Sequence, residues 1–211
     1  MTRIVFVSDR PNLPLTIPPE PVWRLSVERY HQIVETGILT KDDPIELLEG
    51  WLIQKMPKNP RHRAATKLTR DALEAIVPQG WYVDSQEPIT LSDSEPEPDV
   101  IIVRGDTRDY LDRHPGAADL GLVVEIADAT LERDRSIKKR LYARAGISIY
   151  WIVNLPQEQL EVYDRPNNST ENPDYDRDRI YRLGERVNVA ISSQAIGSIT
   201  VNDLFPTAIN N

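Results

Sequence analysis

Two uninterrupted apolar runs constrain the fold of this chain more than any other feature. They cover residues 100–103 (VIIV) and 120–124 (LGLVV), and a third run, IYWIV, follows at residues 149–153. A strand with one face in water alternates apolar and polar residues, whereas a strand buried on both faces is continuously apolar. The three runs therefore predict the centre of a sheet that is covered by helices on both sides.

The other elements are predicted from periodicity and from the positions of glycine and proline. Apolar residues recur at helical spacing over residues 26–37, 60–77 and 133–145. Further strands are expected at residues 45–48, 51–53, 81–83, 88–91, 160–163, 180–183 and 198–201. This order of elements predicts an α/β fold in which a mixed β-sheet is flanked by helices.

Length and composition indicate a single globular domain. A chain of 211 residues can bury a sizeable core, and five prolines between residues 11 and 21 predict an extended arm. We therefore expect an arm over residues 1–25 and one domain over residues 26–211. The chain contains no cysteine, which excludes disulfides, thiolate metal sites and cysteine nucleophiles. It has neither a long apolar run nor a signal-peptide pattern, so a cytoplasmic protein without a membrane partner is expected.

Charge gives an ambiguous indication of the partner. The net charge of −8 argues against a protein that coats nucleic acid nonspecifically, because such proteins are basic overall. Basic residues nevertheless gather in two clusters. The first comprises Lys55, Lys58, Arg61, His62, Arg63, Lys67 and Arg70, and the second comprises Arg133, Arg135, Lys138, Lys139, Arg140 and Arg144. Each cluster fits a surface that faces phosphate groups and a solvated helix face equally well.

Two carboxylates stand at the ends of the central apolar runs. Asp99 immediately precedes the run at 100–103, and Glu125 directly follows the run at 120–124. If these strands are neighbours, both carboxylates lie at one edge of the sheet and form a site for a hard divalent cation such as Mg²⁺. Either acid alone is more often an ordinary turn or strand-end residue. Glu125 is harder to explain in that way, because a buried carboxylate requires a partner or an ion.

Helical phase selects one lysine from the basic helix. Ile137 and Leu141 mark the face that packs on the sheet. At about 100° per residue from Ile137, Lys138 falls at about 100°, inside this face, whereas Lys139 falls at about 200°. Lys138 is therefore directed toward the sheet, and Lys139 toward solvent or a phosphate backbone. The alternative is that Lys138 only extends past the edge of the core or pairs with Asp134.

Several segments together resemble a known family. They are ELLEGWLIQKMPKNPRH (46–62), PDVIIV (98–103), LVVEIADAT (122–130), DRSIKKRLYARAGISIYWIVN (134–154) and VNDLFP (201–206). Their order and spacing are similar to those of the Uma-type family of bacterial restriction endonuclease-like proteins, which belongs to the PD-(D/E)XK nuclease superfamily. The similarity extends from Val27 to Phe205.

The resemblance implies a restriction-endonuclease-like fold, a bound Mg²⁺ (or Mn²⁺) and hydrolysis of DNA phosphodiester bonds. It gives Asp99 and Glu125 the role of metal ligands. It gives Lys138 the role of the lysine that positions the attacking water or stabilises charge on the phosphate. Glu46 matches the early acid of the family's entry hairpin and would also belong to the catalytic set. An exposed hairpin acid is an equally good interpretation of Glu46.

The same resemblance suggests residues that contact the substrate. His62 would lie near a substrate phosphate, with a helix-start capping or surface role as the alternative. Arg61 and Lys139, which belong to the two basic clusters, are also expected to bind substrate. One position departs from the superfamily pattern, because Ala127 stands where the lysine usually follows the second acid by two residues. The active lysine must then come from another element, and helical phase independently selects Lys138.

Two classes of function are therefore compared. The first is an endonuclease that cleaves DNA with a metal-activated water. The second is a catalytically inactive protein with the same fold that binds nucleic acid or a protein. Hydrolysis of another phosphate ester is a third hypothesis. The sequence has neither a glycine-rich nucleotide loop nor a nucleophile-elbow motif. By analogy with nucleases that cut both strands, a homodimer is possible.

Overall fold

A computed structural model describes residues 21–40, 42–167 and 169–206 of the chain. In this part, six strands form one mixed sheet in the order β3-β4-β5-β6-β7-β8. They are β3 (Trp81–Asp84), β4 (Val100–Arg104), β5 (Leu120–Ala127), β6 (Ile149–Asn154), β7 (Gln159–Pro166) and β8 (Tyr175–Arg182). Neighbouring strands are antiparallel except β5 and β6, which are parallel. Most of the arm predicted over residues 1–25 lies outside the described residues.

The apolar runs form the centre of this sheet, as their continuity predicted. Every residue of β5 is buried, and so is every residue of β4 except its last. Successive side chains of β5 enter two different cores: Val124 and Ile126 pack in one, and Val123 and Ala127 pack in the other. The fold is therefore the predicted mixed sheet with covered faces.

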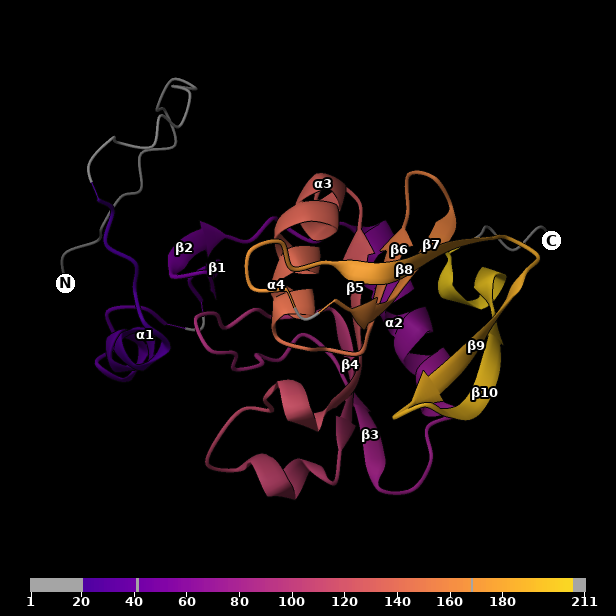
Figure 1. Cartoon of the computed structure of the whole chain (residues 1–211), viewed down its shortest axis with the longest axis horizontal. Helices are drawn as coiled ribbons and strands as arrows, with labels where there is room; N and C mark the ends of the chain where they lie inside the picture. Colours follow the sequence, from indigo (N-terminus) through magenta and orange to yellow (C-terminus); the bar gives the residue numbers. More distant parts are fainter. Residues whose placement is uncertain (1–20, 41, 168, 207–211) are drawn as a thin grey trace.

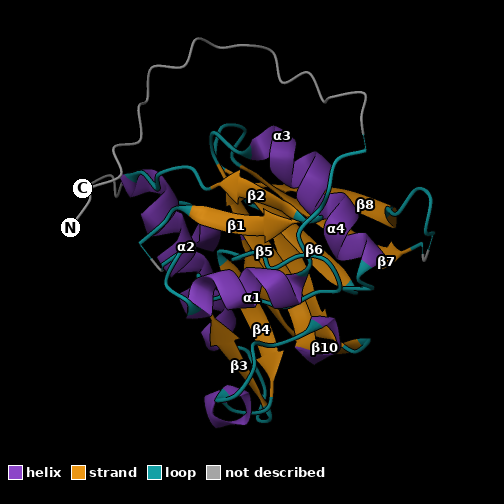
Figure 2. Ribbon diagram, turned by 90° about the vertical axis from the view of Figure 1, so that its left-hand side faces the viewer, coloured by secondary structure: helices purple, strands orange, loops and turns teal. Residues whose placement is uncertain are grey.

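Different elements cover the two faces (Figures 1 and 2). On one face lie α2 (Pro60–Glu74) and the hairpin of β9 (Arg186–Ile191) and β10 (Gln194–Thr200). On the other face lies a continuous helical segment made of α3 (Leu131–Arg133), η3 (Asp134–Lys138) and α4 (Lys139–Arg144). This segment connects β5 to the parallel strand β6, because parallel strands require a crossover connection.

The remaining elements surround this core. The hairpin of β1 (Ile45–Leu48) and β2 (Trp51–Gln54) contributes Leu48 to the core on the α4 side. Next to the hairpin lies α1 (Val27–Glu35), which buries only Val27. Short turns η1 (Thr107–Tyr110), η2 (Ala117–Asp119) and η4 (Val201–Leu204) complete the described part. None of the described helices is long and apolar enough to cross a lipid bilayer.

The strand predictions need two corrections. Residues 88–91 do not form a strand, and Thr90 makes only an isolated bridge to Gly116. The amides of Ile89 and Leu91 instead donate to the carbonyl groups of Pro96 and Ser94, so this segment pairs within its own loop. Strand β9 was not predicted, and β8 and β10 begin earlier than the strands expected at 180–183 and 198–201.

A buried carboxylate on β7, that of Glu161, joins the segment of α3, η3 and α4 to the sheet through hydrogen bonds. Glu161 on β7 accepts hydrogen bonds from Arg135 of η3 at 2.6 and 3.0 Å. It also accepts from Asn154 at 2.7 Å and from the Tyr163 hydroxyl at 2.8 Å. Burial alone would raise the pKa of Glu161, but the hydrogen bonds from Arg135, Asn154, Tyr163 and Gln159 outweigh burial and lower this pKa to about 2.

This carboxylate predicts an acid-sensitive contribution to stability. A lowered folded-state pKa stabilises the protein above the unfolded pKa, and the stabilisation is lost as pH falls through the folded value. We expect Glu161 to contribute about 3 kcal/mol to the free energy of unfolding at neutral pH. This contribution should be lost as pH falls from about 4.5 to about 2. Denaturant unfolding across this pH range should show a shallower acid dependence for Glu161→Gln. Glu158→Gln, at an exposed acid, serves as control, and an equal pH dependence in Glu161→Gln and the unaltered protein would refute the prediction.

Candidate active site

Asp99 and Glu125 lie at the same end of two adjacent strands. Strands β4 and β5 are antiparallel neighbours in which Val100 lies opposite Val124. Asp99, just before β4, therefore meets Glu125 near the end of β5. Alternation along both strands directs the two side chains to the face covered by α3, η3 and α4. Only 6% of Asp99 and 4% of Glu125 is exposed. The pairing of β4 with β5 confirms the expectation that the two strands are neighbours.

Asp99 is contacted from three separate segments. Its Oδ2 atom accepts a hydrogen bond from the Ile126 amide at 2.9 Å and lies 3.2 Å from Nε2 of His62. Its Oδ1 atom lies 3.8 Å from Nζ of Lys58. His62 is brought there by the start of α2, where the Asn59 side chain caps the helix by accepting the His62 amide at 2.9 Å. The capping role is therefore filled by Asn59, and the His62 ring faces the acid.

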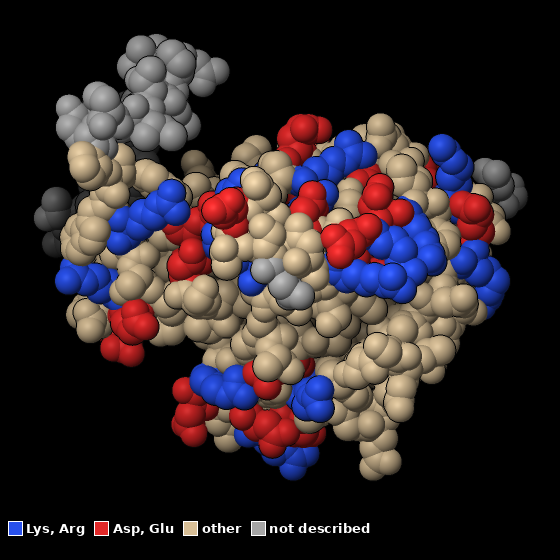
Figure 3. All heavy atoms as spheres, viewed as in Figure 1, with Lys and Arg blue, Asp and Glu red and all other residues tan. Residues whose placement is uncertain are grey.

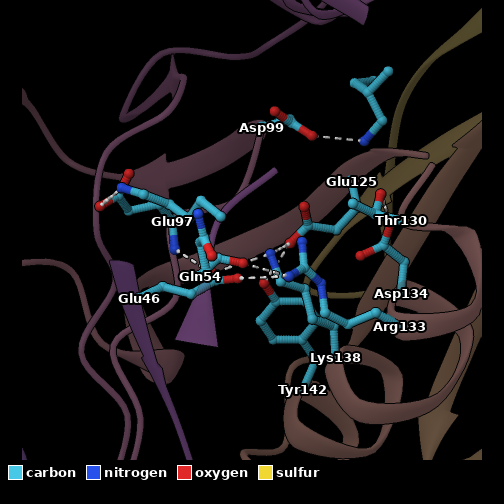
Figure 4. Close-up of polar contacts among 12 residues, drawn as sticks. Glu46, Gln54, Glu97, Asp99, Glu125, Thr130, Arg133, Asp134, Lys138 and Tyr142 are labelled. Carbon is cyan, nitrogen blue, oxygen red and sulfur yellow. Dashed lines mark hydrogen bonds and ion pairs between the residues drawn. The ribbon is translucent and has the colours of Figure 1, made fainter. Parts of the chain in front are cut away.

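Lys138 reaches the acids from a π-helical turn. This turn, Asp134–Lys138, lies between α3 and α4. Nζ of Lys138 lies 2.9 Å from Oε1 of Glu125 and 3.3 Å from Oε2 of Glu46 (Figure 4). Only 4% of Lys138 is exposed. The predicted inward direction is confirmed, although a constant 100° per residue does not hold through a π turn.

Glu46 belongs to the same cluster, and the alternative that it is an exposed hairpin acid is wrong. Strand β1 carries it, and only 1% of it is exposed. Its Oε2 atom accepts a weak hydrogen bond from the Glu97 amide at 3.4 Å. Its Oε1 atom is buried without a hydrogen-bond partner and lies 3.9 Å from Nη1 of Arg133. Such an oxygen is costly unless a proton, water or cation satisfies it.

The buried acids outnumber the buried cation: Glu46, Asp99, Glu125 and Asp134 are gathered about Lys138. Burial raises the pKa of Glu125 to about 8, with the ammonium group of Lys138 acting in the opposite direction. Burial also raises the pKa of Asp134. Burial alone would lower the pKa of Lys138, but the neighbouring carboxylates together raise it. Additional positive charge would therefore be stabilised in this cluster.

The donor atoms of this cluster fit a hard divalent cation. Carboxylate oxygens are the ligands that Mg²⁺ and Mn²⁺ prefer, and the unpartnered Oε1 atom of Glu46 adds an oxygen that lacks a hydrogen-bond donor. Across the described segments, no three His, Cys, Asp or Glu side chains are already arranged to hold a metal ion. Mg²⁺ is commonly bound through only one or two carboxylates, with waters and substrate phosphates completing its shell. Asp99 and Glu125 can supply those two carboxylates.

The acids line a cavity of about 80 Å³ whose opening carries basic side chains. Lys58 is 40%, Arg133 21% and His62 13% exposed at the side chain. Asn59 and Thr130 also line the cavity. A negatively charged group that enters the cavity would be attracted by the positive charges of Lys58 and Arg133.

Two residues that were expected to bind substrate lie elsewhere. Arg61 does not line the cavity, and its exposed guanidinium lies 3.7 Å from Glu158. Lys139 pairs with Asp174 at 2.8 Å and lies over the Tyr163 ring. An acid from the segment before β8 thus pairs with Lys139, which its position on the helix could not reveal, and the role of Lys139 in substrate binding stays a prediction.

Most of the second basic cluster is neutralised in the same way. Arg135 pairs with Glu161, Arg140 with Glu49, and Arg144 with both Glu49 and Asp93. Figure 3 accordingly shows basic and acidic side chains interspersed on the visible face. The sequence left open a phosphate-facing surface and a solvated helix face, and in the structure these three arginines instead pair with acids of the same molecule.

The sequence interpretation missed three residues of the site: Lys58, Arg133 and Tyr142. Lys58 and Arg133 were noted only as members of basic clusters, and nothing in their spacing separates them from their neighbours. Tyr142 lies on the packing face of α4, where an aromatic residue is expected to be core. Its hydroxyl donates a hydrogen bond to Oε1 of Glu125 at 2.7 Å, a contact between residues 17 positions apart.

Comparisons with known proteins show the family of the chain and agree with its fold. The sequence model of the Uma2 family, described as "Putative restriction endonuclease", matches residues 27–196. Among solved structures, the chain resembles one described as a putative nuclease of the DUF820 family from Anabaena variabilis, with a TM-score of 0.61 and 18% sequence identity. The alignment covers 81% of this chain and 95% of that one. No curated protein sequence matches.

Proposed function

Since the chain belongs to the Uma2 family, as its sequence motifs predicted, we propose that it is a divalent-metal-dependent endonuclease that hydrolyses DNA phosphodiester bonds. One observation carries the proposal. Two buried carboxylates from adjacent strands, Asp99 and Glu125, lie in one cavity with a buried lysine whose ammonium group contacts Glu125. The nuclease-like fold supports this interpretation.

In the proposed reaction, Asp99 and Glu125 hold the cation. When bound there, Mg²⁺ or Mn²⁺ would lower the pKa of water and neutralise charge that develops on phosphate oxygens. The water oxygen would attack phosphorus and give up one proton to solvent, while the bond from phosphorus to the leaving sugar oxygen breaks and that oxygen takes up one proton from solvent. The products are one phosphate end and one hydroxyl end.

The remaining side chains position these groups. Lys138 favours the ionised form of Glu125 through its 2.9 Å contact and adds positive charge near the phosphate. His62, at the start of α2, contacts Asp99 at 3.2 Å and helps fix its orientation. Lys58 and Arg133, at the opening, would bind phosphate oxygens of the incoming strand.

Metal removal gives the direct test. Supercoiled, linear and single-stranded DNA are incubated with purified protein and Mg²⁺ or Mn²⁺, with and without excess EDTA. We expect cleavage that is abolished by EDTA and restored by added metal, because the acids alone do not activate water. Gel electrophoresis of the products reports strand breaks.

Two outcomes would contradict the proposal. Cleavage unaffected by EDTA would refute the metal role. Absence of cleavage on all three substrates, together with DNA binding that does not require metal, would instead support an inactive nuclease fold that binds nucleic acid.

A further inference from the structure

The buried tyrosine on α4 makes a contact that packing does not require. Tyr142 is fully buried, and its hydroxyl donates to Oε1 of Glu125 at 2.7 Å. Lys138 donates to the same oxygen at 2.9 Å. One carboxylate oxygen of Glu125 thus accepts two hydrogen bonds from one helical segment.

The second carboxylate oxygen of Glu125, Oε2, has different contacts. Within the described residues, no hydrogen bond is made to Oε2. Figure 4 shows Tyr142 and Lys138 approaching Glu125 from the side opposite Asp99. With Oε1 held by two donors, the carboxylate has little freedom to rotate, and Oε2 remains available to the cavity.

Two other buried tyrosines of the same core donate to backbone carbonyl groups, and a third, Tyr163, donates to Glu161, which lies outside the candidate site. The hydroxyl of Tyr150 donates to the backbone carbonyl of Asp134 at 3.0 Å, and that of Tyr175 donates to the carbonyl of Ile147 at 2.9 Å. A buried phenol needs a partner, and a backbone carbonyl satisfies it. Tyr142 alone of these four donates to a carboxylate of the candidate site.

We propose that Tyr142 is a positioning residue that fixes the Glu125 carboxylate so that Oε2 faces the cation. This inference rests on the proposed metal-dependent function and adds a residue to it. Hydrogen bonds to metal-ligating carboxylates orient them, and loss of such a partner commonly lowers metal affinity 10- to 100-fold.

The spacing of the helical segment makes the arrangement specific. Asp134, Lys138 and Tyr142 are four residues apart in turn, and all three are buried. The π turn ends at Lys138, and α4 continues with ordinary helical geometry. Lys138 and Tyr142 therefore lie one turn apart on the same face and reach one oxygen together.

The test compares Mn²⁺ affinity in the full chain of Tyr142→Phe with that of Tyr150→Phe. Each substitution removes one buried hydroxyl and keeps the ring, so both proteins are expected to fold. Mn²⁺ binding is measured by isothermal titration calorimetry, and stability by thermal unfolding without metal. We expect the dissociation constant to rise about 10- to 100-fold in Tyr142→Phe and less than about threefold in Tyr150→Phe, at comparable loss of stability.

The outcomes separate this inference from the proposed function. Mn²⁺ affinity of Tyr142→Phe equal to that of the unaltered protein, or an equal loss in both variants, would overturn the positioning role while the metal site stands. If the unaltered protein binds no Mn²⁺, the proposed metal site is overturned, and the role of Tyr142 falls with it.

Discussion

Replacing Lys138 by methionine is expected to lower the free energy of unfolding by about 3–5 kcal/mol. The substitution removes the ammonium group that contacts Glu125 at 2.9 Å and Glu46 at 3.3 Å. Both carboxyl groups are almost completely buried. Deleting one partner of a buried ion pair leaves an uncompensated charge, or forces the acids to take up protons.

Divalent cations should reverse much of this loss. Mg²⁺ that binds the acids replaces the missing positive charge, and a ligand that binds only the folded state stabilises it. We therefore expect millimolar Mg²⁺ to raise the melting temperature of Lys138→Met more than that of the unaltered protein. Thermal and urea unfolding with and without Mg²⁺ measure both effects.

Lys139→Met provides the matched control for this prediction. Its side chain is 22% exposed and pairs with Asp174, an acid that is 51% exposed. A pair of this kind contributes about 1 kcal/mol or less. If Lys138→Met were no more destabilising than Lys139→Met, the buried charge cluster would be refuted as a feature of the folded protein.

Replacing Asp99 by asparagine is expected to lower DNA cleavage at least about 100-fold, because loss of a metal ligand should cost no less than loss of its supporting partners. Asparagine has nearly the same shape, and its carbonyl oxygen can still accept the Ile126 amide that Asp99 accepts at 2.9 Å. The negative charge is lost, so Mn²⁺ affinity should fall with cleavage while the melting temperature changes little.

Asp119→Asn serves as the control for the loss of a carboxylate. Asp119 also accepts a backbone amide, that of Gly116 at 2.8 Å, and also pairs with a basic side chain, Arg113. It does not line the cavity of the candidate site. Cleavage by Asp99→Asn at the rate of Asp119→Asn would remove Asp99 from the catalytic machinery.

The elements that determine the site were largely predictable because they depend on local pattern. Continuous apolarity predicted β4 and β5, and the helical period predicted that Lys138 faces inward. Proximity of the two acids followed once those strands were taken as neighbours. The prediction of a strand at 88–91 was wrong, because the amides of this segment donate to the carbonyl groups of Pro96 and Ser94. The apolar pattern of residues 88–91 does not record which groups those amides bind.

Ion pairs between residues far apart in the sequence could not be predicted from the local sequence pattern. Arg140 and Arg144 are 91 and 95 residues from Glu49, their common partner. Basic residues have the same spacing on a helix whose side chains face solvent and on a helix whose side chains pair with acids of the same molecule. For this reason a phosphate-facing surface and an internally paired one could not be distinguished from the sequence.

The amino-acid pattern was enough to predict the buried central strands and the inward direction of Lys138, because strand and helix periods place each side chain on a definite face. It thereby selected Asp99, Glu125 and Lys138. Three features became visible only in the folded protein: the burial of Glu46, the hydrogen bond from the Tyr142 hydroxyl to Glu125, and the pairing of Lys139 with Asp174. Such contacts join segments far apart in the chain, and chain topology, which no local period records, brings them together.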